Sequence, residues 1–186
     1  MTRALQAAVL MDSEDVLLEQ SAGLRLASDL LVPQDQPATA RAMMDGFAVA
    51  CEVSGDQVSE QAVFAVVETI TAGLVPQRVL LPGEAARIMT GAMVPGGAMC
   101  VVPVERTVLQ SVAAEGVDGD LGIERVRIGR EYLKPSAHIL PAGSLARRGE
   151  ILLPTGTQIR AQHIALLAEH GFARVPVRRR VEAAVL

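Results

Sequence analysis

The sequence has almost no aromatic residues and a single lysine, Lys134. Aromatic side chains make up 2% of the 186 residues, and tryptophan is absent. The chain therefore has very few aromatic side chains on which bases or sugars could stack. With a single lysine, covalent catalysis by a lysine amine is also disfavoured. The 17 basic and 21 acidic residues give a net charge of -4, which argues against a nucleic-acid partner. A polar ligand must be held by backbone, hydroxyl, carboxylate or arginine groups.

Long apolar runs are also missing. None approaches the roughly 20 residues that a membrane-spanning helix needs. The N-terminus, Met1-Thr2-Arg3, lacks an apolar core followed by a small-residue cleavage site, so we expect no signal peptide. We therefore expect a cytoplasmic protein with no membrane partner. The two cysteines, Cys51 and Cys100, fit neither a zinc-ligand spacing nor a disulfide framework, so we expect buried, reduced thiols. The hydrophobic content of 50% excludes disorder and allows a sizeable core.

Common catalytic signatures are absent as well: the chain has no lysine-ended phosphate loop, no GxSxG and no HExxH. The three histidines are scattered. His163 and His170 are seven positions apart on one expected helix, and His138 is remote. Surface or helix-end positions are their simplest interpretation.

The two ends of the chain share a pattern of helices and short extended pieces. At the N-terminal end, the pattern predicts a helix over Glu14 to Ala22 that stops at Gly23, then a strand over Leu24 to Val32. At the C-terminal end, it predicts a helix over Ala161 to Ala168, with Ile164, Leu167 and Ala168 on its apolar face and Gly171 at its end, then strands over Val175 to Val177 and Val181 to Leu186.

Between these ends, from about Met43 to Leu133, short apolar segments alternate with glycine or proline turns, as in a β-rich unit. The expected strands are Ala62 to Ile70, Arg78 to Leu81, Ala85 to Met89, Met99 to Val104 and Ile123 to Ile128. In the last strand, Val126 and Ile128 point to the opposite face from Arg125 and Arg127, so we expect one face of this strand to be exposed to solvent. The fold class is therefore α+β and β-rich, with one domain built from both ends and a second domain inserted.

Two loops could carry chemistry. Asp45-Gly46 is either an ordinary Asx-type turn or a carboxylate that binds Mg²⁺. Thr90-Gly91, at the end of the strand that carries Arg87, is either an ordinary hairpin turn or a set of hydroxyl and N–H donors suited to an oxyanion. Glu105, which closes an apolar strand, is by default a solvated charge.

Three segments, in this order and spacing, are similar to motifs of one known family. Met44 to Val49 resembles AMDGYAV, Arg87 to Pro95 resembles RIMTGAPVP, and Val101-Val102 with Glu105 resembles AVVxxE. Leu153 to Thr157 and Ile164 to Gly171 resemble later motifs. The family is that of the molybdopterin molybdenumtransferases, which includes MoeA and the gephyrin E domain. The resemblance covers nearly the whole chain.

The resemblance implies a mixed α/β linker domain over 1–36 and 143–180 and an inserted β-barrel-like domain over 37–142. Residues 181–186 would be the first strand of a pterin-binding domain that this chain lacks. The implied activity is transfer of molybdenum from molybdate onto adenylylated molybdopterin with Mg²⁺. Asp45 and Thr90 match functional residues of the family, Asp45 as a metal ligand, and Gly46, Arg87, Gly91 and Glu105 are expected to bind substrate. A homodimer is implied, in which the inserted domain faces the partner's pterin-binding domain.

The chain departs from the family in two loops. Ala40 to Met43 stand where the family usually has Asp-Asn-Ser-Ala, and Gly143-Ser144-Leu145 stand where it has Gly-Glu-Asp. Loss of a carboxylate weakens a cation site. Two alternatives to the enzyme therefore stay open: a non-catalytic dimerisation or scaffold module of the same fold, and a stand-alone anion-binding domain.

Overall fold

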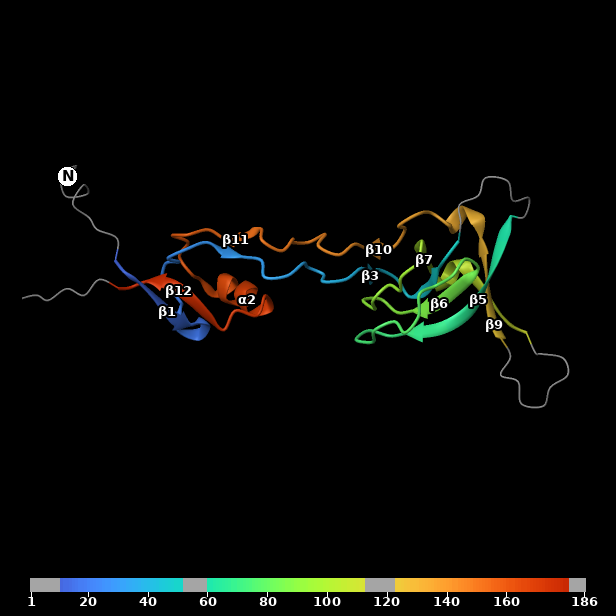
Figure 1. The fold of residues 1–186 in the computed structure, drawn as a ribbon, viewed down its shortest axis with the longest axis horizontal. Helices are drawn as coiled ribbons and strands as arrows, with labels where there is room; N and C mark the ends of the chain where they lie inside the picture. The colour runs from blue at the N-terminus through green and yellow to red at the C-terminus, as the bar shows by residue number, and fades with distance from the viewer. Residues whose placement is uncertain (1–10, 52–59, 113–122, 181–186) are drawn as a thin grey trace, which may run out of the picture. The chain divides into compact units, whose positions relative to one another are not determined.

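The computed structural model describes residues 11–51, 60–112 and 123–180. The chain divides into two compact units. Unit 1 comprises Met1–Gln34 and Ala146–Leu186, and unit 2 comprises Asp35–Leu145. The first unit is therefore assembled from both ends of the chain, and the second is one continuous segment (Figure 1).

Unit 2 contains most of the strands. They are β3 (Arg41–Ala42), β4 (Gly46–Val49), β5 (Gln61–Ile70), β6 (Glu84–Ile88), β7 (Cys100–Pro103), β8 (Thr107–Val112), β9 (Ile123–Gly129) and β10 (Ile139–Leu140). Two 3-10 helices, η2 (Val104–Arg106) and η3 (Arg130–Tyr132), follow β7 and β9. Six of these strands form one curled sheet in the order β7-β4-β6-β5-β9-β8, and β3 pairs with β10.

The six-stranded sheet has a core on each face. All four residues of β4 are buried, and they alternate between the two faces because successive strand residues point to opposite sides. Phe47 and Val49 join a cluster with Phe64 and Val126, whereas Ala48 packs with Ile88 and Val101 on the other side. This double burial fixes β4, and with it the loop that precedes it.

The solvent-exposed face predicted for the strand over Ile123 to Ile128 is confirmed in part. Val126 and Ile128 are buried in β9, and Arg125 is exposed, while Arg127 is half-buried.

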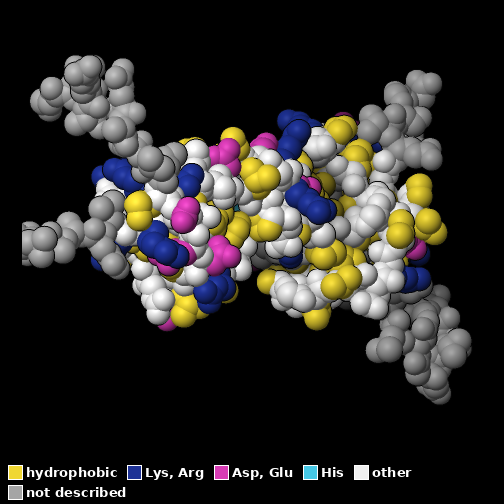
Figure 2. Space-filling model, turned by 60° about the vertical axis from the view of Figure 1, so that its left-hand side comes forward, with side chains coloured by type: hydrophobic (Ala, Val, Ile, Leu, Met, Phe, Trp, Pro, Cys, Tyr) yellow, Lys and Arg dark blue, Asp and Glu magenta, His cyan; other side chains and the backbone are white. Residues whose placement is uncertain are grey.

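Hydrophobic side chains also reach the surface at several places (Figure 2). In unit 2 they include four residues of the β5–β6 connection: Leu74, Val75, Val79 and Leu81.

Unit 1 contains two strand pairs: β1 (Ser13–Leu17) with β12 (Arg174–Arg178), and β2 (Leu30–Leu31) with β11 (Ile151–Leu153). It also contains the 3-10 helix η1 (Leu18–Gln20) and helix α2 (Ala161–Glu169). The expected helix and its stop at Gly171, where φ is +80°, are confirmed. Leu167 is in the core as predicted, but Ala168 is exposed. None of the helices in the described ranges is long and apolar enough to cross a bilayer.

Three local predictions are wrong. The helix expected over Glu14 to Ala22 is strand β1 followed by η1, because Ser13 to Leu17 pairs residue by residue with β12. This tertiary pairing overrides a local helical pattern. Only Leu30–Leu31 of the strand expected over Leu24 to Val32 lies in a ladder, and Arg78 to Leu81 is irregular. Strand β8 was not predicted, and the strand expected over 181–186 lies outside the described residues.

The α+β, β-rich fold class is confirmed: strands dominate, and one α-helix lies in the described ranges. The inserted part is a curled sheet.

Candidate functional site

Asp45 and Thr90 are 45 positions apart in sequence but hydrogen-bonded in space. The Asp45 Oδ1 atom accepts hydrogen bonds from both the backbone N–H and the hydroxyl of Thr90, each at 2.7 Å. Asp45 immediately precedes β4, and Thr90 comes two residues after β6. These strands are antiparallel neighbours with Gly46 opposite Ile88, so the sheet register brings the two loops together.

The pair is exposed and charged. The Thr90 hydroxyl, and secondarily its backbone N–H, holds the pKa of the Asp45 carboxyl below its ordinary value. Oδ1 carries both bonds, so the other carboxylate oxygen is left without a protein donor among the described residues. The pair therefore presents an ionised carboxylate, fixed on one oxygen and open on the other.

The donors of the Thr90 turn are consequently not free for an oxyanion, which differs from the expectation for this loop. Both are used on Asp45. An ionised Asp45 also repels an anion unless a cation lies between them. Thr90 is therefore suited to position Asp45, and Asp45 is suited to accept a hydrogen bond or bind a cation.

The Thr90-Gly91 turn is held in place by hydrogen bonds to β3. Gly91 N–H donates to the Ala42 carbonyl at 2.8 Å, and Ala42 N–H donates to the Ala92 carbonyl at 2.9 Å. Arg41 Nη1 adds a bond to the Gly91 carbonyl at 3.2 Å. Gly91 has a φ of +79°, which glycine adopts without strain. In this structure, then, Gly91 shapes the turn.

Gly46 allows β7 to approach β4 closely. A Cβ atom at position 46 would meet the Val102 carbonyl oxygen and would lie 2.9 Å from the Pro103 Cα. Both are backbone atoms, so they have no side-chain freedom to move aside. On the same side, Val104 N–H donates to the Asp45 carbonyl at 3.0 Å, which ties η2 to the Asp45 loop.

The structure does not bring Arg87 to the pair. Its guanidinium forms a salt bridge with Glu124 at 2.9 Å and lies 5.4 Å from the centroid of the Phe47 ring. Arg87 is thus engaged in linking β6 to β9. Glu105 is exposed on η2 and lines a cleft.

This cleft, which we call the η2–η3 cleft, has a volume of about 700 Å³. Its lining includes Met44, Glu105, Arg106, Tyr132, Lys134 and His138, all from unit 2. Of these, only Glu105 was a predicted site residue. Arg106, Tyr132 and His138 belong to no motif, and the only signal for Lys134 was that it is the single lysine.

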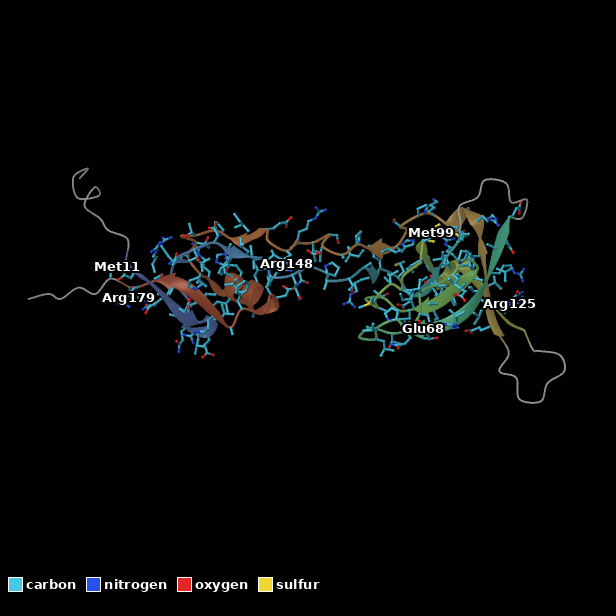
Figure 3. The ribbon with its side chains drawn as sticks, in the orientation of Figure 1. Met11, Glu68, Met99, Arg125, Arg148 and Arg179 are labelled. Atoms are coloured by element: carbon cyan, nitrogen blue, oxygen red, sulfur yellow. The ribbon has the colours of Figure 1, made fainter. Side chains whose placement is uncertain are left out.

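The two cysteines are free thiols, as predicted, but only Cys100 is buried. The Cys51 Sγ atom donates to the Met99 Sδ atom at 3.5 Å (Figure 3 labels Met99). Burial raises the pKa of Cys51, and raises that of Cys100 to about 11. At neutral pH both are therefore protonated, weak nucleophiles.

No ready-made metal cage is present within the described ranges: nowhere do three or more His, Cys, Asp or Glu side chains gather to hold an ion. A single exposed carboxylate such as Asp45 fits a different mode of metal binding, in which the protein supplies only part of the ligand set. Mg²⁺ usually keeps several waters and is bound through one or two carboxylates together with substrate phosphates.

The class of the protein follows from comparison of its sequence with known families. Residues 1–171 match the family described as the MoeA N-terminal region (domain I and II). The chain belongs to this family, and the family resemblance drawn from the motifs is confirmed.

Named relatives agree. The chain is 35% identical over 170 residues to the molybdopterin molybdenumtransferase of Bacillus subtilis (strain 168), covering 91% of this chain and 37% of that one. It is 35% identical to molybdopterin molybdenumtransferase 2 of Mycobacterium tuberculosis (strain ATCC 25618 / H37Rv), covering 92% and 39%. It therefore spans well under half of the length of these relatives.

A solved structure shows the same fold. The molybdopterin biosynthesis MoeA protein from Pyrococcus horikoshii superimposes with a TM-score of 0.71 at 30% identity, covering 90% of this chain and 41% of that one.

Proposed function

We propose that this chain is the N-terminal and linker region of a molybdopterin molybdenumtransferase. Such an enzyme takes part in molybdenum cofactor biosynthesis and transfers molybdenum from molybdate onto adenylylated molybdopterin. The observation that carries the proposal is the hydrogen-bonded Asp45–Thr90 pair. These two residues match functional positions of the family, and they form one exposed, ionised unit.

In this proposal, Asp45 supplies the charge and Thr90 positions it. Two bonds to Oδ1 fix the orientation of the carboxylate and keep it ionised at neutral pH. Mg²⁺, when bound, would neutralise negative charge between the carboxylate and an anionic substrate. The open oxygen of Asp45 is the group that would hold it. Gly46 and Gly91 serve by shaping the backbone around this carboxylate.

The rest of the site must come from elsewhere. A pterin-binding domain, which the relatives' greater length accommodates, would bind most of the molybdopterin. We propose a cytoplasmic homodimer in which unit 2 of one subunit faces that domain of the partner subunit. Because positioning and charge neutralisation are the chemistry assigned here, small geometric changes in the pair are expected to affect rate strongly.

Complementation tests this proposal. In a strain that lacks the molybdenumtransferase, the full-length gene is expected to restore molybdoenzyme activity. Asp45→Asn removes the charge with little change in shape, and Thr90→Val removes the hydroxyl, so both are expected to reduce activity at least tenfold. Thr90→Ser keeps both donors and is the matched control. Wild-type activity in Asp45→Asn, at equal protein level, would refute the proposed role.

The scaffold alternative is favoured by one observation. Ser144 and Leu145 replace two acids of the family motif, and Leu145 is 74% exposed, so the loop offers an apolar side chain to solvent where a carboxylate is usual. If the full-length natural gene restores no activity but the protein still dimerises, the scaffold function is the correct one.

A further inference from the structure

Both cysteines of the chain and one methionine gather on one side of the six-stranded sheet. Cys100 is fully buried in the cluster that contains Phe64, and Cys51 and Met99 pack against the same cluster. The Cys51 Sγ atom lies 3.5 Å from the Met99 Sδ atom. The sulfur atoms are therefore concentrated at one place in unit 2, at the opposite end of β4 from Asp45.

The register of β4 and β7 brings the two cysteines to the same face of the sheet. Val49 lies opposite Cys100, and Cys51 follows Val49 by two positions. Residues two apart in an extended chain point the same way, so Cys51 is a diagonal neighbour of Cys100, within reach of its side chain. The packing of Val49, Cys51 and Cys100 in one cluster agrees with this placement.

Met99 completes the group because it lies just outside β7. Neighbouring residues within a strand point to opposite faces, but β7 begins at Cys100, and Met99 packs on the same cluster as Cys100. The Met99 N–H donates to the Val49 carbonyl at 2.8 Å, and the Met99 carbonyl accepts the Ser136 N–H at 2.9 Å. Backbone hydrogen bonds therefore position the thioether beside the thiols.

Two thiols and a thioether are a ligand set for a soft cation. Thiolate and thioether sulfur select Cu(I) and similar ions, whereas Mg²⁺ and Mn²⁺ prefer oxygen ligands. Two sulfur atoms bound tetrahedrally to one ion at about 2.3 Å are about 3.8 Å apart, and the observed 3.5 Å between Cys51 and Met99 is close to that separation. Structural zinc sites take four ligands from His, Cys and carboxylates, and no group of even three such side chains occurs in the described ranges.

The surroundings of the two thiols also suit a cation between them. Burial raises the pKa of Cys51, and the positive charge of Arg130 opposes that rise. Burial and the nearby Cys51 raise the pKa of Cys100, and the backbone N–H of Lys134 opposes that rise. A cation bound to both sulfurs neutralises the thiolate charge that burial disfavours. The Cys51 side chain is partly exposed, so an ion can enter from there.

We propose that Cys51, Met99 and Cys100 form a three-sulfur site that binds one soft monovalent cation of the Cu(I) class. On binding, the two S–H bonds are replaced by two metal–sulfur bonds, and the two protons pass to solvent. The thioether donates a lone pair, and the ion keeps its single positive charge, so no oxidant or reductant takes part. The site uses no residue assigned to the molybdenumtransferase chemistry and is independent of the proposed function.

Silver(I) is the first probe, because it is soft and monovalent and keeps its oxidation state during the assay. The reduced 186-residue chain, in buffer free of chloride and added thiol, is titrated with silver nitrate at pH 7 while the released protons are measured. One tightly bound ion per chain and two protons per ion are expected. Cu(I), presented with the competing chelator bathocuproine disulfonate, is expected to bind with the same stoichiometry, and Zn(II) at least a hundredfold more weakly than Cu(I).

Three variants identify the ligands. Cys51→Ser and Cys100→Ser are each expected to weaken silver(I) binding at least a hundredfold and to reduce the release to one proton or fewer per ion. Met99→Leu conserves the side-chain volume and is expected to weaken binding tenfold or more while two protons are still released. The matched control is Met11→Leu, which removes an exposed thioether of unit 1 (Figure 3) and is expected to leave binding unchanged.

Natural affinity in Met99→Leu or in Cys51→Ser would overturn the three-sulfur site. Release of a single proton by the natural chain would exclude Cys100 as a ligand, and one ion shared by two chains would mean that the ion bridges their Cys51 thiols; either result overturns the site. If Cys100→Ser is not folded by circular dichroism, Cys51→Ser and Met99→Leu decide the matter, because both of these side chains are only partly buried. None of these measurements depends on molybdenumtransferase activity, so the site and the proposed function fail separately.

Discussion

The Asp45 Oδ1 atom accepts two hydrogen bonds from one residue, Thr90, through its N–H and its hydroxyl. The hydroxyl is the larger cause of the lowered pKa of Asp45. Thr90→Val is therefore expected to raise the pKa of the Asp45 carboxyl towards its ordinary value, whereas Thr90→Ser leaves it low. Titration of the side-chain carboxyl carbon by NMR measures this. An unchanged pKa in Thr90→Val would mean that the hydroxyl bond does not form in solution.

The same pair makes stability depend on acid. Because the folded-state pKa of Asp45 is lowered, its ionised form stabilises the fold fully above the ordinary carboxyl range, and this contribution is lost as pH falls through the folded-state pKa. The urea midpoint of Asp45→Asn is expected to lie below that of the natural chain at pH 7. The difference is expected to shrink at pH 3. A difference that grows in acid would contradict this sign.

Gly46 is predicted to be intolerant of any side chain. Gly46→Ala places a Cβ against the Val102 carbonyl and the Pro103 Cα, so β4 and β7 must separate. We expect a loss of about 2 kcal/mol in the free energy of unfolding. Gly23→Ala is the matched control, because Gly23 has a φ of +79° but open space around it, and the loss there is about 1 kcal/mol. Chemical denaturation measures both values, and an equal loss would exclude the proposed clash.

The sequence allowed the Asp45 and Thr90 loops to be singled out, but it did not reveal that they bond to each other. That contact depends on the antiparallel register of β4 and β6, which sets Gly46 opposite Ile88. The η2–η3 cleft was missed for a similar reason. Arg106 and Tyr132 are 26 positions apart, and only the folding of β8 and β9 between η2 and η3 brings them together.

Local patterns succeeded where local forces decide the structure. Helix α2 was predicted from the spacing of its apolar residues and from Gly171 at its end; in the structure Gly171 has a positive φ and Leu167 lies in the core, as that pattern requires. They failed for Ser13 to Leu17, where every residue pairs with a strand more than 150 positions later in the chain. A window of sequence contains no information about such a distant partner, so the segment resembled a helix.

The thiols are predicted to react in a fixed order. Cys51 is partly exposed, while Cys100 is buried with a pKa of about 11. At pH 8 only about one Cys100 in a thousand is a thiolate, and only the thiolate attacks. With Ellman's reagent, the native protein is expected to release one equivalent slowly and a second only on unfolding. In Cys51→Ser the first phase disappears. Rapid reaction of two equivalents in the native state would contradict the burial of Cys100.

Arg87 distinguishes a structural role from direct substrate binding. Its side chain is 33% exposed, and it pairs with Glu124 and lies over the Phe47 ring. A partly exposed salt bridge and a cation–π contact together contribute about 1 kcal/mol. Arg87→Gln is therefore expected to lower the free energy of unfolding by about that amount, and Glu124→Gln in the same background is expected to add little. Complementation by Arg87→Gln is expected to be normal below the unfolding temperature. If activity is lost while stability is unchanged, Arg87 contacts the substrate, as its position in the RIMTG motif first suggested.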